Sequence, residues 1–399
     1  MPENLFDTFV DRTASNSAKW ETGRKYGINI IPMSVADMDL PAPGILIESL
    51  AEQNSAGIYG YTILPDDYYD IVRKYLFRHY HYTVANEHIL FCPRIIQAIS
   101  IYIKEFTSPN DSICIFTPSY APILNAISLN NRNIMQCKLI YQKGAYSIDF
   151  NELEKCFITA KTFILISPHN PTGIVWSRND LHKIAELAEK HEVFILSDDV
   201  HADFDFSGNG HLIISALSSY VENHSIICTS PAKTFNIPGL EIANLLICNN
   251  NVRDKFQTCM QSLGMHNPNF FSVPAISVAY QYCDTWLNEL RNYIYQNKLT
   301  VKAFFHREIP QLDIVNSEGT YLIWVNYRKL HITEEKLKHW FLDLSHIEVS
   351  WGSDFGAEGD SFFRMNVAMP RTLLIKCLKK IKHGLDFLMQ EGTNYGNER

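Results

Sequence analysis

Six short apolar runs, rich in β-branched residues, recur along the first two thirds of the 399-residue chain. They span residues 88–92, 112–117, 162–167, 193–197, 225–229 and 244–249. Helical patterns lie between them: in residues 179–191, for example, apolar residues recur every three or four positions, and Asn179 or Asp180 can cap the helix. Strands that alternate with helices predict a mostly parallel sheet with helices on both faces. The sequence therefore predicts an α/β fold.

The chain is too long for one ordinary hydrophobic core, so a large domain with a smaller partner is expected. Beyond about residue 285 the pattern changes to long helical stretches followed by two apolar segments, at 319–327 and 362–370, which is typical of an α+β domain. We assign residues 45–285 to the large domain. Residues 1–44 and 286–399 are expected to form the small domain together.

Composition excludes several classes of partner. A net charge of −8 and an isoelectric point near 6.0 argue against nucleic acid and anionic membranes, because little positive charge is available to neutralise phosphates. No apolar run could span a bilayer, and residues 1–12 lack the apolar core of a signal peptide. Nine isolated cysteines without zinc spacing predict free thiols, no metal site and a cytoplasmic protein.

Polar side chains follow four of the predicted strands. They are Tyr120 after 112–117, Asn170 after 162–167, Asp198 and His201 after 193–197, and Ser230 and Lys233 after 225–229. The carboxyl ends of parallel strands meet at one edge of a sheet, where open α/β sheets bind ligands. We therefore expect these side chains to converge on one site.

An amine, a carboxylate, an aromatic ring and an anion-binding backbone suit pyridoxal 5'-phosphate. This cofactor needs a lysine for covalent attachment, an acid facing its ring nitrogen, a stacking partner and a phosphate cup. Lys233 is the candidate for attachment, and its amine, once released by the substrate, would move protons. Desolvation next to an apolar strand would lower its pKa toward neutrality.

Longer motifs give the chain a resemblance to a known family. Ordered segments include "FDTFVDRTASNSAKW" at 6–20, "VADMDLPAP" at 35–43, "HNPTG" at 169–173, "SDDVHADF" at 197–204 and "AKTFNIPGL" at 232–240. The chain resembles fold-type I pyridoxal-phosphate enzymes of the class I/II aminotransferase superfamily, and within them the MalY/PatB-type cystathionine β-lyases, or C-S lyases. The match extends over nearly the whole chain.

The resemblance implies a role for each matching residue. Lys233 resembles the cofactor lysine, Asp198 the partner of the ring nitrogen, Tyr120 the stacking aromatic and Asn170 the donor to the 3'-oxygen and a substrate contact. Ser230, His201, Ile95 and Ile96 are implied cofactor contacts, and Arg364 and Ala36 implied substrate contacts, Arg364 through the carboxylate. Tyr61 resembles a catalytic tyrosine that reaches the phosphate held by the neighbouring subunit, which implies a homodimer with shared sites.

Two departures from the family pattern affect the surroundings of the site. Arg94 stands where the family usually has a glycine in the phosphate cup, followed here by Ile95 and Ile96. The amides of that helix N-terminus can still bind phosphate, and Arg94 either adds a charge to it or points away. Ser34 replaces the tryptophan that usually precedes "VADMD", so the substrate range can differ.

The resemblance favours a C-S β-lyase that converts L-cystathionine or other L-cysteine conjugates to thiol, pyruvate and ammonia. Two alternatives stay open. An aminotransferase acting on another amino acid shares the first proton abstraction, and a MalY-like protein with a regulatory binding role would keep the fold. A complete set of cofactor residues speaks against a purely binding role.

Overall fold

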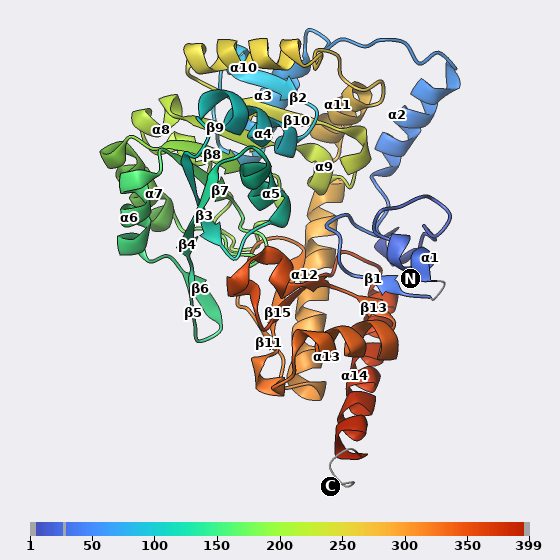
Figure 1. Cartoon of the computed structure of the whole chain (residues 1–399). Coiled ribbons are helices and arrows are strands. Elements are labelled where there is room, and N and C mark those ends of the chain that lie inside the picture. Colours follow the sequence, from blue (N-terminus) through green and yellow to red (C-terminus); the bar gives the residue numbers. More distant parts are fainter. Residues whose placement is uncertain (1–4, 27–28, 395–399) are drawn as a thin grey trace.

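The computed structural model describes residues 5–26 and 29–394, and its central feature is a seven-stranded sheet (Figure 1). In spatial order the strands are β2 (Ile89–Cys92), β10 (Ala243–Leu246), β9 (Ser225–Thr229), β8 (Phe194–Asp198), β7 (Thr162–Ile166), β3 (Ser112–Thr117) and β4 (Asn133–Lys138). β10 runs antiparallel to both neighbours, and all other neighbouring pairs are parallel. The predicted α/β fold with a mostly parallel sheet is confirmed.

Helices cover both faces of this sheet because successive strand residues point to opposite sides. On one face, side chains such as Ile113 and Ile164 pack against α4 (Ile95–Phe106), α5 (Ala121–Leu129) and α10 (Asn250–Ser262). The other face is covered by α3 (Tyr68–Tyr80), α6 (Phe150–Thr159), α7 (Arg178–His191) and α11 (Ser272–Tyr282). Every residue of β7 and β9 is buried, which explains their unbroken apolar sequences.

Two local features differ from the sequence prediction. β4 carries no continuous apolar run, because it is the edge strand and most of its side chains are exposed or half-buried. The predicted helix at 179–191 starts one residue earlier, at Arg178. Its N-cap is Ser177, whose hydroxyl accepts from the Asp180 N–H while the Asp180 carboxylate accepts from the Ser177 N–H.

A second, four-stranded sheet lies below the first in Figure 1. Its strand order is β11 (Asp313–Ile314), β12 (Leu322–Asn326), β15 (Phe362–Asn366) and β14 (Ser350–Trp351). Its core includes side chains of α12 (Asp284–Glu308), α13 (Glu334–Lys338) and α14 (Arg371–Asn394). The N-terminal segment packs into the same core: β1 (Ile31–Pro32) pairs in parallel with β13 (Ile347–Glu348) in a separate two-stranded sheet.

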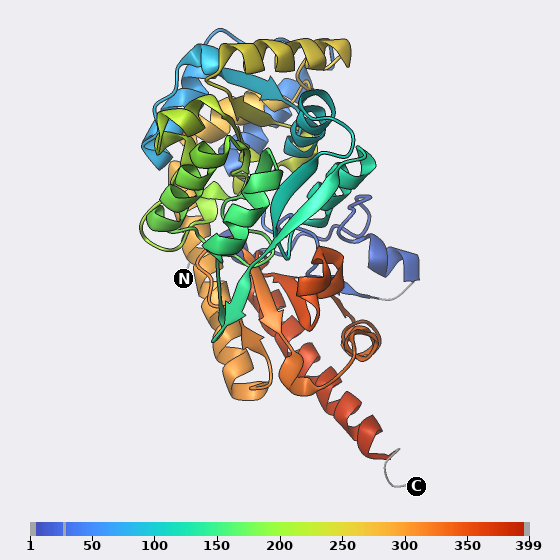
Figure 2. The same ribbon diagram turned by 60° about the vertical axis from the view of Figure 1, so that its left-hand side comes forward.

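The two sheets are connected by α12, which runs from the upper into the lower part of the molecule (Figure 1), and by the hairpin of β5 (Ile140–Gln142) and β6 (Ala145–Ser147). Figure 2 shows this hairpin extending toward the C-terminal part. The boundaries predicted at 44/45 and 285/286 fall in the first turns of α2 (Gly44–Ser55) and α12. The division into two domains at those positions remains a proposal.

Three further features concern membrane-spanning helices, metal-ligating side chains and the cysteines. In the part of the chain that the structure describes, no helix is long and apolar enough to cross a membrane. The same residues contain no group of three or more His, Cys, Asp or Glu side chains that could hold a metal ion. All nine cysteines are free thiols, seven of them buried.

Candidate active site

The predicted site residues lie at the carboxyl ends of four adjacent strands, in the order β9, β8, β7 and β3. Asp198, the last residue of β8, pairs in register with Ile166 of β7 and Cys228 of β9. Ser230 and Lys233 follow β9, Asn170 follows β7 and Tyr120 follows β3. The parallel arrangement therefore brings the polar residues that end or follow these four strands to one edge.

Lys233 lies in α9 (Pro231–Thr234), a single turn behind the apolar strand β9. Its Nζ donates to the backbone carbonyl of Ala36, 2.7 Å away. Burial lowers the pKa of Lys233 to about 8; among nearby charges, Asp37 and Asp198 act upward and Arg364 downward. A half-buried amine with a pKa near 8 can serve as a nucleophile and as a base.

Asp198 is buried at the end of β8, where its carboxylate accepts a hydrogen bond from the Val200 N–H at 3.2 Å. Burial raises the pKa of Asp198 to about 7, and the neighbouring charge of Asp199 adds to the effect. Because the pKa of this buried carboxylate lies near 7, a cationic N–H placed beside it would stabilise its charged form.

Arg364 reaches the same edge from β15 of the second sheet and is also buried. Its guanidinium donates to Asn170 Oδ1 (2.8 Å), the Ser34 carbonyl (2.9 Å) and Ser350 Oγ (3.0 Å), all neutral oxygens. Burial lowers the pKa of Arg364 to about 10, and Nε has no hydrogen-bond partner among the described residues. A buried guanidinium whose hydrogen-bond acceptors are all neutral is suited to binding a carboxylate.

Three further predicted residues line the same region. Tyr120 precedes α5, and burial raises the pKa of its hydroxyl while the charge of Arg364 lowers it. Buried His201 has no partner for Nδ1 within the described residues, and burial, Lys233 and Arg364 hold its pKa well below the ordinary value. Ser230 caps α9: its Oγ accepts from the Ala232 N–H at 3.0 Å and donates to the Ile242 carbonyl.

The predicted phosphate cup is the N-terminus of α4, which begins at Ile95 and continues through Ile96. Arg94 is the N-cap, and its guanidinium forms an ion pair with Glu241. The Arg94 side chain is 57% exposed, so a role at the phosphate would require it to leave that pair.

Two contacts around the predicted residues were not read from the sequence. Tyr321 donates its hydroxyl to the Ala36 carbonyl at 2.9 Å, and Ser350 accepts from Arg364. The segment "GTYLIW" was a usable signal for Tyr321, because it matches the family motif. Ser350 had no such signal, since only the pairing of β14 with β15 brings it to Arg364.

Tyr61 lies apart from this group. Its side chain is 99% exposed, in the segment between α2 and α3. The structure of one chain therefore does not bring Tyr61 to Lys233.

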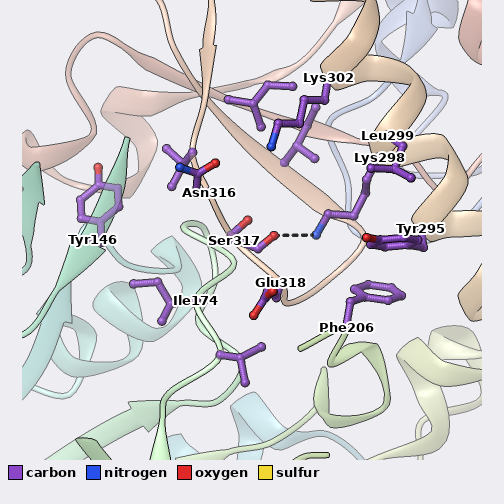
Figure 3. Close-up of a pocket in the computed structure, with 14 residues that line it drawn as sticks. Tyr146, Ile174, Phe206, Tyr295, Lys298, Leu299, Lys302, Asn316, Ser317 and Glu318 are labelled. Carbon is purple, nitrogen blue, oxygen red and sulfur yellow. Dashed lines mark hydrogen bonds between the residues drawn. The ribbon is translucent and has the colours of Figure 1, made fainter. Parts of the chain in front are cut away.

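A separate cavity of about 450 Å³ lies beside α12 (Figure 3). It is lined by Lys298 and Lys302 but by none of the predicted site residues. Lys298 Nζ donates to the carbonyls of Gly319 (3.0 Å) and Thr320 (3.2 Å), just before Tyr321, and burial lowers its pKa to about 7. Lys298 thus tethers a loop, although its pKa resembles that of Lys233.

Comparison with known proteins assigns the chain to a family. The model of the family "Aminotransferase class I and II" matches residues 29–381. Cystathionine beta-lyase PatB of Bacillus subtilis is 34% identical, covering 95% of this chain and 99% of PatB. Protein MalY of Escherichia coli is 28% identical, covering 93% of this chain and 96% of MalY.

Among solved structures, cystalysin from Treponema denticola, which contains a pyridoxal 5'-phosphate cofactor, superimposes with a TM-score of 0.93 at 30% identity. The match covers 96% of this chain and 99% of cystalysin. The chain belongs to the aminotransferase class I and II family, within the group that includes PatB and MalY.

Proposed function

We propose that the protein is a pyridoxal-phosphate-dependent C-S β-lyase that cleaves L-cystathionine or related L-cysteine conjugates. The observation that carries the proposal is the meeting of three ionisable groups at one sheet edge: half-buried Lys233 with buried Asp198 and Arg364. The group has an amine for cofactor attachment, together with a carboxylate and a guanidinium that form no ion pair with any described residue. The match to PatB, a cystathionine beta-lyase, supports the same activity, and the match to cystalysin supports the cofactor.

The residues present fit the cofactor. Lys233 would hold it covalently and Asp198 would face its ring nitrogen, where a cationic N–H would stabilise the buried carboxylate in its charged form. The remaining contacts are assigned by resemblance: Tyr120 would stack on the ring, Asn170 would reach the 3'-oxygen, His201 would adjoin the ring, and Ser230 with the Ile95 and Ile96 amides would bind the phosphate.

The chemistry of β-elimination divides between the cofactor and the chain. When bound, pyridoxal phosphate supplies an electron sink for the substrate Cα. Arg364 would hold the substrate carboxylate, while Asn170 and the Ala36 segment flank it, and the released Lys233 amine would take the Cα proton. The Cβ–S bond then breaks, the thiol leaves, and the remaining three-carbon unit is hydrolysed to pyruvate and ammonia.

An assay with L-cystathionine tests this function. We expect pyruvate and free thiol in equal amounts, at a rate that does not change when a keto acid is added. A lyase needs no amino acceptor, whereas an aminotransferase does. Turnover only in the presence of a keto acid would contradict the proposal and favour the aminotransferase alternative.

Loss of Arg364 should weaken substrate binding selectively. Arg364→Ala should raise KM for cystathionine roughly 100-fold, because a bidentate contact to a carboxylate contributes about 3 kcal/mol. Cofactor affinity should stay unchanged. Both quantities are measured by titrating the variant with substrate and with pyridoxal phosphate.

Arg94→Ala is the matched control for that titration. If Arg94 serves the phosphate, this variant should lose cofactor affinity and keep its substrate KM. If its pair with Glu241 is its only role, both should stay as in the wild type. An Arg364→Ala variant that instead loses cofactor would contradict the carboxylate role.

The proposal includes a homodimer in which Tyr61 acts on the cofactor phosphate held by the partner chain. Its support is the exposure of Tyr61 together with neighbouring Ile58, Tyr59 and Ile63, which are also exposed. Such a run of apolar side chains on a surface is a common mark of an interface. A cytoplasmic location belongs to the same proposal and is supported by the free thiols.

A hybrid dimer tests the shared site. One subunit carries Lys233→Ala and the other Tyr61→Phe, each with its own tag. If Tyr61 acts across the interface, both lesions fall in one site and the other site is native. The hybrid should then show about half the wild-type activity and one site of wild-type cofactor affinity. Weakened affinity in every competent site, or a monomer at assay concentration, would refute the model.

A further inference from the structure

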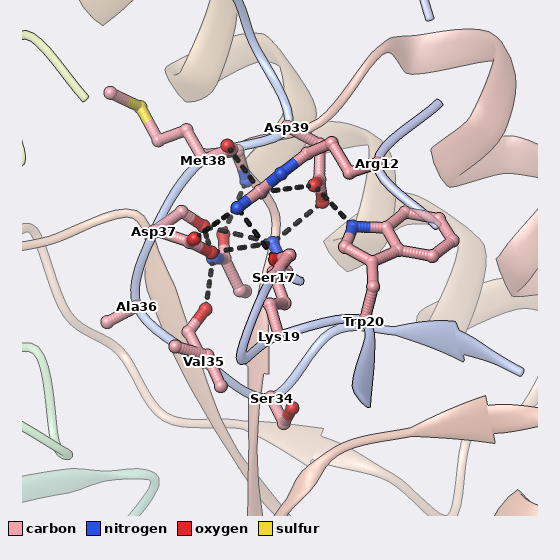
Figure 4. Close-up of polar contacts among 12 residues, drawn as sticks. Arg12, Ser17, Lys19, Trp20, Ser34, Val35, Ala36, Asp37, Met38 and Asp39 are labelled. Carbon is pink, nitrogen blue, oxygen red and sulfur yellow. Dashed lines mark hydrogen bonds and ion pairs between the residues drawn. The ribbon is translucent and has the colours of Figure 1, made fainter. Parts of the chain in front are cut away.

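The segment from Ser34 to Asp39, drawn in Figure 4, contacts the proposed site through its backbone. The Ala36 carbonyl accepts two hydrogen bonds, from Lys233 Nζ (2.7 Å) and from the Tyr321 hydroxyl (2.9 Å). The Ser34 carbonyl accepts from Arg364 at 2.9 Å. The backbone of this segment thus contacts the amine and the guanidinium that carry the proposed chemistry.

Two asparagines close to Lys233 and Arg364 in the sequence also hold this segment. Asn236, three residues after Lys233, accepts from the Met38 N–H and donates to the Met38 carbonyl, both at 2.9 Å. Asn366, two residues after Arg364, donates to the carbonyls of Val35 (2.8 Å) and Asp37 (2.6 Å). The backbone is therefore fixed on both sides of Ala36.

Two acidic residues of the segment form ion pairs with two basic residues that precede it (Figure 4). We call these four residues the N-terminal ion cluster: Arg12, Lys19, Asp37 and Asp39. Arg12 bridges Asp37 (2.6 Å) and Asp39 (2.9 Å), while Lys19 pairs with Asp39 at 2.7 Å. Lys19 also donates to the Asp37 carbonyl at 2.9 Å. The Lys19 side chain is 0% exposed and that of Asp39 1%.

Stability alone is a weak explanation for such a cluster. Taking charges out of water costs about as much as their attraction returns, so buried pairs can often be replaced by apolar residues without loss of stability. What buried charges provide is a defined geometry, because each must keep its partners. Here the geometry that they define is that of the backbone around Ala36.

We propose that the N-terminal ion cluster positions the Ala36 carbonyl, which receives the Lys233 amine whenever that amine is not bound to the cofactor. The cluster residues are positioning residues, since they act on Lys233 through the segment and not on the substrate. The inference rests on the proposed function in one respect: it takes Lys233 as the cofactor lysine.

The cluster also acts on Lys233 through charge. Asp37 and Asp198 stabilise the protonated amine, whereas Arg364 and Lys19 destabilise it. The nearby His201 and Tyr321 are neutral at pH 7, since burial lowers the pKa of the first and raises that of the second. Asp37 is the largest of the charge effects, so removing its charge should lower the Lys233 pKa from its value of about 8.

Attachment of pyridoxal phosphate to the cofactor-free full chain, followed by absorbance across pH, measures this effect. Only the neutral amine attacks, so the rate rises with pH through the amine's pKa. In Asp37→Asn the midpoint should move to lower pH by about one unit. Asp11→Asn makes the same charge change at an exposed residue outside the N-terminal ion cluster and should keep the wild-type midpoint. A wild-type midpoint in Asp37→Asn would overturn the charge effect.

Arg12→Lys separates position from charge. It keeps the positive charge but cannot bridge Asp37 and Asp39 as the guanidinium does. In Arg12→Lys the attachment rate should rise with pH at the wild-type midpoint. Its plateau at high pH should be about tenfold lower, because a displaced Lys233 amine attacks the cofactor less often. A wild-type plateau rate would overturn the positioning role.

Failure of the positioning role can be distinguished by experiment from failure of the proposed lyase activity. A wild-type chain that attaches the cofactor at Lys233 but releases no pyruvate from cystathionine would refute the lyase activity and leave the positioning role intact. A wild-type lyase whose Asp37→Asn and Arg12→Lys variants match it in midpoint and plateau would refute the positioning role alone.

Discussion

Lys233→Ala is expected to lower cystathionine turnover by about 10⁴-fold or more, since it removes both the point of cofactor attachment and the base for the Cα proton. The purified variant should also lack the absorbance band of lysine-bound cofactor. Pyruvate release and a visible spectrum of the same sample check both effects.

Lys233→Arg is the matched control for this result. It keeps a positive charge at the position but has no amine that can be deprotonated near neutral pH. Equal loss in both variants would show that amine chemistry, and not charge, is what Lys233 contributes. Turnover near the wild-type rate in either variant would contradict the assignment.

Asp198→Asn should reduce turnover by about 10²- to 10³-fold, or about 3 to 4 kcal/mol, while the cofactor remains bound. The amide keeps the shape of the carboxylate and can still accept from the Val200 N–H, but it carries no charge to hold the ring nitrogen protonated. Exchange of the substrate α-proton with solvent deuterium, followed by NMR, measures the affected step.

Asp198→Glu provides the control for Asp198→Asn. It retains the negative charge on a longer side chain and should recover part of the exchange rate. Near-native exchange in Asp198→Asn would contradict the role of Asp198, because the charge would then be dispensable.

Much of this architecture could be predicted from the sequence. Strands buried on both faces, such as β7 and β9, have continuous apolar runs that stand out in the chain. Residues just after such strands, including Asn170 and Lys233, must then lie at one edge of a parallel sheet. The topology of neighbouring strands in the structure confirms this order of the elements.

Other features depend on pairings between distant residues and could not be read locally. The edge strand β4 lacks an apolar run because one side of it faces solvent. Lys19, which local sequence would place on the surface, is fully buried because Asp39 lies opposite it. The pair between Arg94 and Glu241 joins residues 147 positions apart.

The proposed role of Arg364 was available from the family resemblance alone. Nothing in the sequence around it indicates that β15 of the second sheet delivers the guanidinium to Asn170 of the first. That contact arises from the way the two sheets meet, which no periodicity in the chain encodes.

The central claim is that Lys233 holds the cofactor, and borohydride reduction of the purified protein tests it most directly. Reduction makes the bond between cofactor and lysine permanent, so that peptide mapping by mass spectrometry locates it. The account predicts a pyridoxyl adduct on Lys233. Lys298 is the sharpest alternative, because burial also lowers its pKa, to about 7, beside a cavity of its own. An adduct on Lys298, or on any lysine other than Lys233, would contradict the account.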